Sequence, residues 1–142
     1  MSLLSRKALL AVAAVIDVAL YARGQLVSAK DLAARHALPA RHLEPVLQAL
    51  VREGVLKGVR GPRGGYELAR ERRRITVNDI LKAAGASEDD DKTMQPGSSL
   101  LEQVVMPAVA QAEKVFVGAL SRITIEELAR RAEPFTKSAG ES

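Results

Sequence analysis

The 142-residue sequence contains no cysteine and very few aromatic residues. The missing thiols exclude disulfides, zinc fingers, all-cysteine iron–sulfur sites and thiol redox switching. Aromatic residues make up only 3% of the chain, whereas apolar residues make up 47%. The core must therefore be aliphatic, and the abundance of Ala, Leu and Val favours helices. A chain of this length suits one ordinary domain, or a small domain with an appendage.

The sequence also lacks an apolar run near its start that is long enough to cross a bilayer. Arg6 and Lys7 precede an apolar stretch, residues 8–16, that resembles a signal peptide, but Asp17 interrupts it. Apolar residues recur at helical spacing through the same region, which is typical of a core helix: Leu9, Val12, Val15, Ile16, Ala19 and Leu20. We therefore expect an unprocessed, cytoplasmic protein without a membrane segment.

No arrangement of residues indicates catalysis or metal binding. Serines and histidines are not placed as nucleophile and base, and no Gly-Lys-Ser/Thr follows the glycines of "GPRGG". The four consecutive acids of residues 88–91 lack the spacing of a calcium loop, so a solvated linker is the better interpretation. His36, at the end of a predicted helix, is expected to cap that helix. We predict no catalytic residue, no metal and no cofactor.

Charge is divided unevenly along the chain. Residues 1–84 hold 15 Lys and Arg against 7 acids, whereas residues 85–142 hold 6 against 10. The basic N-terminal part and the acidic C-terminal part suggest that only the N-terminal part binds a polyanion.

Four capping-box patterns mark predicted helix starts: Ser28-x-x-Asp31, Thr76-x-x-Asp79, Ser99-x-x-Glu102 and Thr124-x-x-Glu127. Helices are expected over 5–23, from 29 to about 37, over 40–53, from 76 to the stop at Gly85, over 99–122, and briefly from 124. The predicted organisation is a first domain over 1–85, an acidic linker over 86–98, a long helix with a short last helix over 99–132, and a loose tail over 133–142.

Between the third and fourth of these helices lies a glycine-rich basic stretch, "KGVRGPRGGYEL". Pro and Gly forbid a helix there and favour a hairpin loop between two β-prone segments. Residues 52–74 contain eight basic residues and three acids. Two short helices joined by a turn, followed by a hairpin with a basic tip, describe a winged helix-turn-helix. Tyr66 is expected to pack its ring under the wing with its hydroxyl at the edge.

The segment "LPARHLEPVLQALVREGVLKGVRGPRGGYEL" resembles the Rrf2 family of bacterial winged-helix regulators, and the likeness covers about residues 5–128. The resemblance implies a dimer that binds DNA sequence-specifically. It places Arg41, His42 and Glu44 in the major groove, and Arg60 and Arg63 of the wing in the minor groove. The predicted DNA-binding set also includes Ser28, Lys57 and Gly64. This chain departs from the family in two ways: it has no cysteines before the long helix, and Pro45 lies within the predicted recognition helix.

The helix predicted over 99–122 carries an apolar seam whose spacing alternates between three and four residues: Leu101, Val105, Ala108, Ala112, Val115 and Ala119. A helix of this length exceeds what the small winged domain can cover, so we expect the seam to pair two subunits. Pro107 should kink the helix, because it cannot donate to Gln103 and crowds that carbonyl.

These observations predict a mainly α protein with a small β-hairpin: a winged helix-turn-helix domain followed by a long C-terminal dimerisation helix. The expected function is a homodimeric transcription regulator, a repressor, that reads a pseudo-palindromic site in double-stranded DNA without an iron–sulfur cluster. The sequence leaves three modes of regulation open: a small-molecule effector, a partner protein, or a constitutive role without either. Two alternatives stay open: a protein-interaction module that docks an acidic partner, and an RNA-binding domain.

Overall fold

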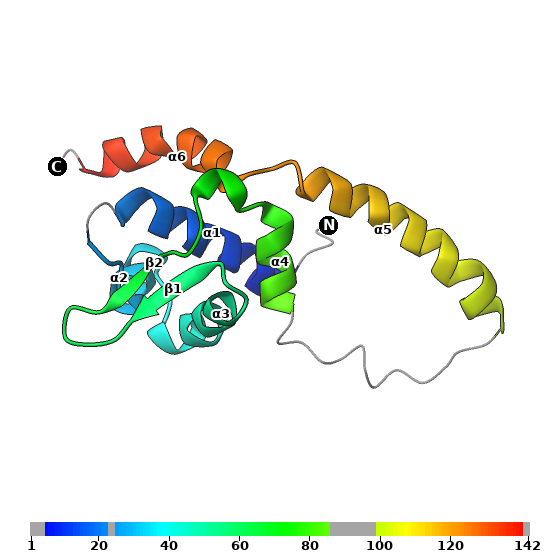
Figure 1. The fold of residues 1–142 in the computed structure, drawn as a ribbon, viewed down its shortest axis with the longest axis horizontal. Coiled ribbons are helices and arrows are strands. Elements are labelled where there is room, and N and C mark those ends of the chain that lie inside the picture. The colour runs from blue at the N-terminus through cyan, green and yellow to red at the C-terminus, as the bar shows by residue number, and fades with distance from the viewer. Residues whose placement is uncertain (1–4, 23–24, 86–98, 141–142) are drawn as a thin grey trace.

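The computed structural model describes residues 5–22, 25–85 and 99–140, with the backbone alone for residues 136–140. Its elements follow the order helix, helix, helix, hairpin, helix, helix, helix (Figure 1). Their bounds are α1 Arg6–Tyr21, α2 Ala29–Arg35, α3 Ala40–Arg52, β1 Leu56–Val59, β2 Gly65–Leu68, α4 Val77–Gly85, α5 Met106–Leu120 and α6 Ile125–Gly140, with a 3₁₀ turn at Arg72–Arg74 and a π-helical turn at Leu101–Val105.

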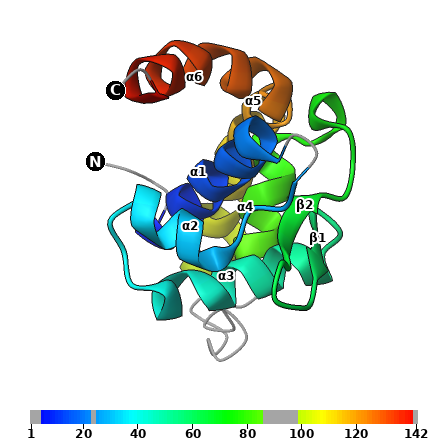
Figure 2. The same cartoon turned by 90° about the vertical axis from the view of Figure 1, so that its left-hand side faces the viewer.

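Helix α1 lies at the centre of the molecule. Figure 2 shows α6 on one side of it and α3 on the other, and α1 also contacts α4 and β2. The largest fully buried side chains are aliphatic: Leu32, Leu43, Leu47, Leu50, Leu56, Ile75, Ile80, Ile125, Val15, Val18, Val46 and Val55. The predicted aliphatic core is confirmed, although the stripe expected on the first helix is shifted. Ala11, Val15 and Val18 are fully buried, whereas Leu9 is 45% exposed.

Hydroxyl caps begin three helices at the predicted places, whereas the fourth predicted cap, Ser99, is wrong. The Ser28 hydroxyl accepts from the Asp31 amide at 3.1 Å, and the Thr124 hydroxyl accepts from the Glu127 amide at 3.2 Å. At Thr76 the box is complete, because the Thr76 amide also donates to the Asp79 carboxylate at 3.1 Å. Each hydroxyl satisfies an amide that has no partner inside its helix. Ser99 already lies within helical backbone.

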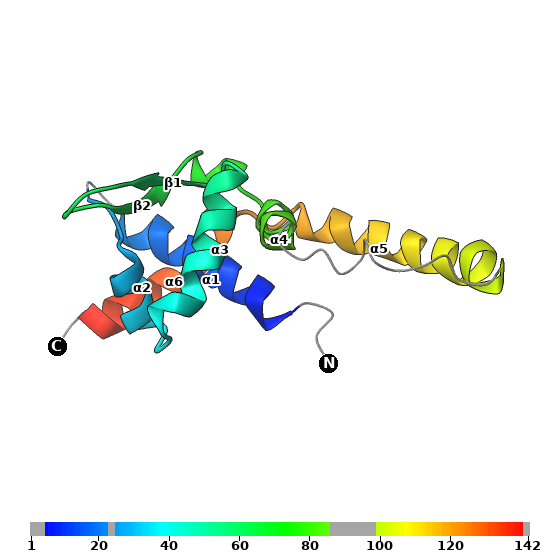
Figure 3. The same ribbon diagram turned by 90° about the horizontal axis from the view of Figure 1, so that it is seen from below.

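The predicted hairpin is confirmed as an antiparallel pair. Leu56 faces Leu68 and Val59 faces Gly65, so residues 60–64 form the connecting loop. Val55 and Leu56 are buried at the base of the hairpin, whereas the tip projects from the body (Figures 1 and 3). The core therefore anchors only one end of the wing.

Helix α5 extends away from this body (Figures 1 and 3). A short backbone pairing holds its C-terminal end: the Val77 amide donates to Ile123 O at 2.8 Å, and the Ile125 amide donates to Ile75 O at 2.8 Å. The chain then returns along α1 as α6, where Ile125 and Ala129 are fully buried.

The irregularity expected at Pro107 takes the form of a π-helical turn. The Met106 amide donates to the carbonyl of Leu101, five residues earlier, just before the proline. A π turn widens the helix locally, which accommodates a residue that has no amide and a bulky ring.

The last helix corrects the sequence analysis, which expected a short helix and a loose tail from Glu133. Helix α6 instead continues to Gly140 and contains Pro134. Its first turns dock on α1, and Glu126 pairs with Arg72 at 2.8 Å. The unfavourable step in helix formation is nucleation, and once this packing has nucleated α6, each further residue adds a hydrogen bond. Pro134 removes one of these hydrogen bonds. Among the described residues, no helix is both long and apolar enough to cross a bilayer.

Candidate nucleic-acid interface

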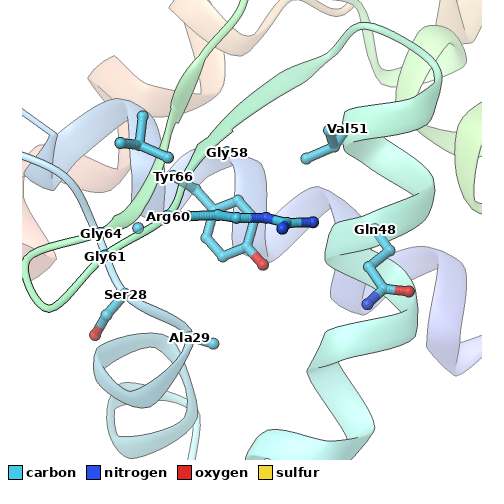
Figure 4. A pocket seen from close by; sticks show the side chains of 11 residues that line it. Ser28, Ala29, Gln48, Val51, Gly58, Arg60, Gly61, Gly64 and Tyr66 are labelled. Atoms are coloured by element: carbon cyan, nitrogen blue, oxygen red, sulfur yellow. The ribbon is translucent and has the colours of Figure 1, made fainter.

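The wing is joined to the start of α2 by a backbone bridge. The Val27 amide donates to Tyr66 O at 3.0 Å, and the Tyr66 amide donates to Val27 O at 2.7 Å. A side chain at Gly65 would lie 2.7 Å from the Val27 carbonyl oxygen, so only glycine permits this approach. The bridge fixes Ser28, the next residue, beside the wing (Figure 4).

Two glycines shape the tip of the wing. Gly61 has φ +120°, a conformation that other residues rarely adopt. A Cβ on Gly64 would overlap the carbonyl oxygen of Val59, and the Gly64 amide donates to Gly61 O at 2.9 Å. The loop that carries Arg60 and Arg63 is therefore held in one tight conformation.

Helix α3 presents a polar face to solvent and buries the opposite face. Leu43, Leu47 and Leu50 are fully buried, whereas the outward positions are exposed: Arg41, His42, Glu44, Pro45 and Gln48. The helix begins at Ala40, with Pro39 as its N-cap, and passes through Pro45 without ending. The predicted base-reading residues thus share one exposed face near the N-terminus of the helix.

A groove of about 540 Å³ separates α3 from the wing. Figure 4 shows the Arg60 side chain extending from the wing in the direction of Gln48 on α3, with the Tyr66 hydroxyl directed into the same space. The lining residues are Ser28, Ala29, Gln48, Val51, Gly58, Val59, Arg60, Gly61, Gly64, Gly65 and Tyr66. Sequence reasoning missed Gln48, although it lies four residues after Glu44 and seven after Arg41, the spacing of one helical face.

Six of the eight basic residues of 52–74 fall into two groups. Arg70, Arg72 and Arg73 have acidic partners within the chain, at 3.6, 2.8 and 2.7 Å respectively. Three exposed cations on the wing have none among the described residues: Lys57, Arg60 and Arg63. The paired arginines already have a counter-ion within the chain, whereas the wing cations are free for an external anion.

A buried ionic cluster holds α2 against α1. Asp17 is only 5% exposed and accepts two hydrogen bonds from the Arg35 guanidinium, at 2.8 and 2.6 Å. Its hydrogen bond raises the pKa of Arg35, and the guanidinium also stacks over the Tyr21 ring at 4.1 Å.

His36 belongs to the same cluster, which corrects its predicted role. Its Nε2 lies 3.2 Å from the Asp17 carboxylate, so the side chain binds α1 instead of capping the carbonyls of α2. A buried carboxylate offers a stronger partner than solvent-exposed carbonyls. The cluster fixes the angle between α1 and the helix-turn-helix.

The predicted pairing seam lies on the projecting helix. Val105, Ala108, Ala112, Val115 and Ala119 are exposed, and Leu101 is half-buried. Val115 alone is 73% exposed, and further apolar side chains around the helix are exposed as well: Leu100, Val104, Met106 and Val109. The residues that contact the body are instead Phe116, Val117 and Leu120, at the C-terminal end. The seam residues from Val105 to Ala119 are therefore not covered by the described part of the chain.

No group of three His, Cys, Asp or Glu side chains that could hold a metal ion occurs among the described residues. The acidic run of residues 88–91 lies outside the described ranges.

A basic hairpin fixed beside the exposed face of α3, the second helix of a helix-turn-helix, defines the class of winged helix-turn-helix DNA-binding proteins. The sequence model of one such family, Rrf2, described as an iron-dependent transcriptional regulator, matches residues 4–131. The chain belongs to the Rrf2 family of transcriptional regulators, which confirms the predicted family and fold class. The matched family and relatives are named as regulators of transcription and not as enzymes.

Relatives and solved structures agree with this assignment. The HTH-type transcriptional regulator IscR of Xenorhabdus nematophila is 30% identical over 135 residues, which cover 92% of this chain and 80% of that protein. The slr0846 protein of Synechocystis sp., named for the same HTH type of regulator, is 34% identical over 139 residues, or 97% and 95% of the two chains. The structure of T. potens IscR is similar at a TM-score of 0.71 and 30% identity, covering 98% of this chain and 91% of that one. The structure of CymR, titled the global cysteine regulator of B. subtilis, is similar at a TM-score of 0.68 and 25% identity, covering 92% of this chain and 98% of that one.

The family description names iron, but this chain has no side chains that could hold a cysteine-ligated iron–sulfur cluster. Such clusters are held by thiolates, and the sequence has none.

Proposed function

We propose that this protein is a homodimeric, sequence-specific repressor that acts on double-stranded DNA in the cytoplasm and uses no iron–sulfur cluster. The observation that carries the proposal is the set of unpaired wing cations beside the exposed face of α3. Lysine and arginine next to phosphates release condensed counterions, which supplies much of the affinity for DNA.

Each recognition helix enters a major groove in this proposal. A helix of about 10–12 Å diameter fits that groove, and its exposed N-terminal side chains reach base edges. Arg41, His42 and Glu44 occupy those positions on α3. Arg60 and Arg63 enter the neighbouring minor groove from the wing, where the narrow width concentrates negative potential. Lys57, Ser28 and Gly64 support the same face: Lys57 as a phosphate contact, Ser28 from the start of α2 and Gly64 by shaping the tip.

Two protomers pair through the seam of α5 in this proposal. Burying the exposed valines of the seam, Val105 and Val115, against a second copy removes apolar surface from water, and the alanines of the seam permit close approach. A symmetric dimer places two recognition helices about one helical turn apart on DNA, so the site is a pseudo-palindrome. Repression requires only that this dimer exclude other proteins from the promoter.

The test is selection of bound fragments from genomic DNA, followed by titration of a selected and a random duplex. We expect two protomers per site and an affinity at least about a thousandfold higher for the selected duplex. A ratio near one would contradict the proposal. It would favour a winged module that docks an acidic protein, or an RNA-binding domain, which the same titration with structured RNA separates.

A further inference from the structure

The order of features on the protein matches the order of features across a DNA duplex. On the protein, α3 is followed by the groove and then by the wing. On the duplex, the major groove is followed by one sugar–phosphate strand and then by the minor groove. With α3 in one groove and the wing in the other, the strand between them must lie over the groove of the protein.

The groove has the chemistry that a phosphodiester needs. Its polar groups include the Tyr66 hydroxyl and the Gln48 amide, which enter from the wing and from α3 (Figure 4). In the described part of the chain neither group has a hydrogen-bond partner. Gly58 and Gly64 line the wing side, where the absence of side chains lets a backbone strand come close.

We propose that this groove seats one phosphodiester of the bound strand, with the Tyr66 hydroxyl and the Gln48 amide donating to its oxygens. The seat presupposes the DNA binding proposed above and names the part of DNA that this surface takes. Both donors are neutral, so they position the strand without releasing counterions, whereas Arg60 at the rim carries charge. The seat fixes the spacing between recognition helix and wing on the duplex.

Two variants test the seat on the selected and random duplexes. Tyr66→Phe removes the hydroxyl and keeps the ring, and Gln48→Ala removes the amide from an exposed helix position. We expect each to weaken binding about tenfold on both duplexes, because each loses one hydrogen bond to a charged group. The preference for the selected sequence and the slope of log affinity against log salt should not change. Gln111→Ala, an exposed glutamine on α5, is the matched control and should bind as the wild type does.

A duplex with one neutral methylphosphonate, scanned along the strand, locates the contact. When the methylphosphonate replaces the seated phosphodiester, the wild type should lose affinity. On that modified duplex, Tyr66→Phe should bind as tightly as the wild type does. Unaltered affinity in both variants would overturn the seat, and so would a changed base preference in Gln48→Ala, which would show that Gln48 reads bases. In both cases the wild type still prefers its selected duplex, so the proposed function stands. Failure of the wild type to bind any duplex would overturn both proposals.

Discussion

The buried cluster around Asp17 makes a quantitative prediction about stability. The Asp17 side chain is 4% exposed and accepts hydrogen bonds from Arg35 and His36 across the α1–α2 contact. Replacing Asp17 by Ala removes all three hydrogen bonds and leaves the guanidinium without its counter-ion.

The expected loss follows from the exposure of the partner that remains. Removing one member of a buried ion pair costs about 3–5 kcal/mol when the other charge stays buried. The Arg35 side chain is 32% exposed, so its guanidinium can regain water, and we expect a smaller loss of about 2 kcal/mol. For a chain of this size, that loss lowers Tm by about 6–8 °C.

Thermal and urea unfolding, followed by circular dichroism, measure this loss. Lys30→Ala is the control, because Lys30 is an exposed charge on α2, and such a change should stay within about 0.5 kcal/mol. A double-mutant cycle with Arg35→Met should return a coupling of about 1 kcal/mol or more. If Asp17→Ala is as stable as Lys30→Ala, the cluster does not hold the two helices together.

Three further predictions concern the wing, the long helix and acid stability. Gly64→Ala should weaken DNA binding at least about tenfold, because its Cβ collides with the Val59 carbonyl. Gly118→Ala is the control, because an added Cβ there has no neighbour within 4 Å. This variant should bind DNA as the wild type does and gain about 0.5–1 kcal/mol of stability. Equal DNA binding by the two variants would contradict the wing geometry. Val115→Glu should shift the protein to monomers in sedimentation, whereas Lys114→Glu, off the seam, should not; an intact Val115→Glu dimer would place pairing elsewhere. The hydrogen bond from Arg72 lowers the pKa of Glu126, so this carboxylate stabilises the fold above its ordinary pKa and loses that effect as pH falls through the lowered value. Glu126→Gln should therefore unfold in urea titrations with a weaker dependence on pH below the ordinary pKa of a glutamate, and an unchanged dependence would count against the pair.

The sequence was informative where the determinants are local. Hydroxyl caps at Ser28, Thr76 and Thr124 act within one helical turn, so their spacing predicted the helix starts. The glycines of the wing determine its turn in the same local way. In the hairpin that forms, the buried Leu56 faces the half-buried Leu68.

Contacts between distant segments were not predictable from the sequence. Asp17 looked like a polar interruption of an apolar run, and only the fold brings Arg35 and His36, eighteen and nineteen residues later, to its carboxylate. The groove escaped notice for the same reason, since Gln48 and Tyr66 come from different elements. The length of α6 depended on its docking against α1, which no local pattern encodes.

The most direct test of the central claim compares Arg60→Ala with Arg131→Ala on the selected duplex over a range of salt concentrations. Arg131 is an exposed arginine on α6. Figure 1 shows α6 on one side of α1 and the wing on the other. We predict that Arg60→Ala costs about 1–3 kcal/mol and lowers the salt slope by about one, while Arg131→Ala changes neither. Identical affinities and slopes for the two variants would contradict the assignment of the wing to DNA.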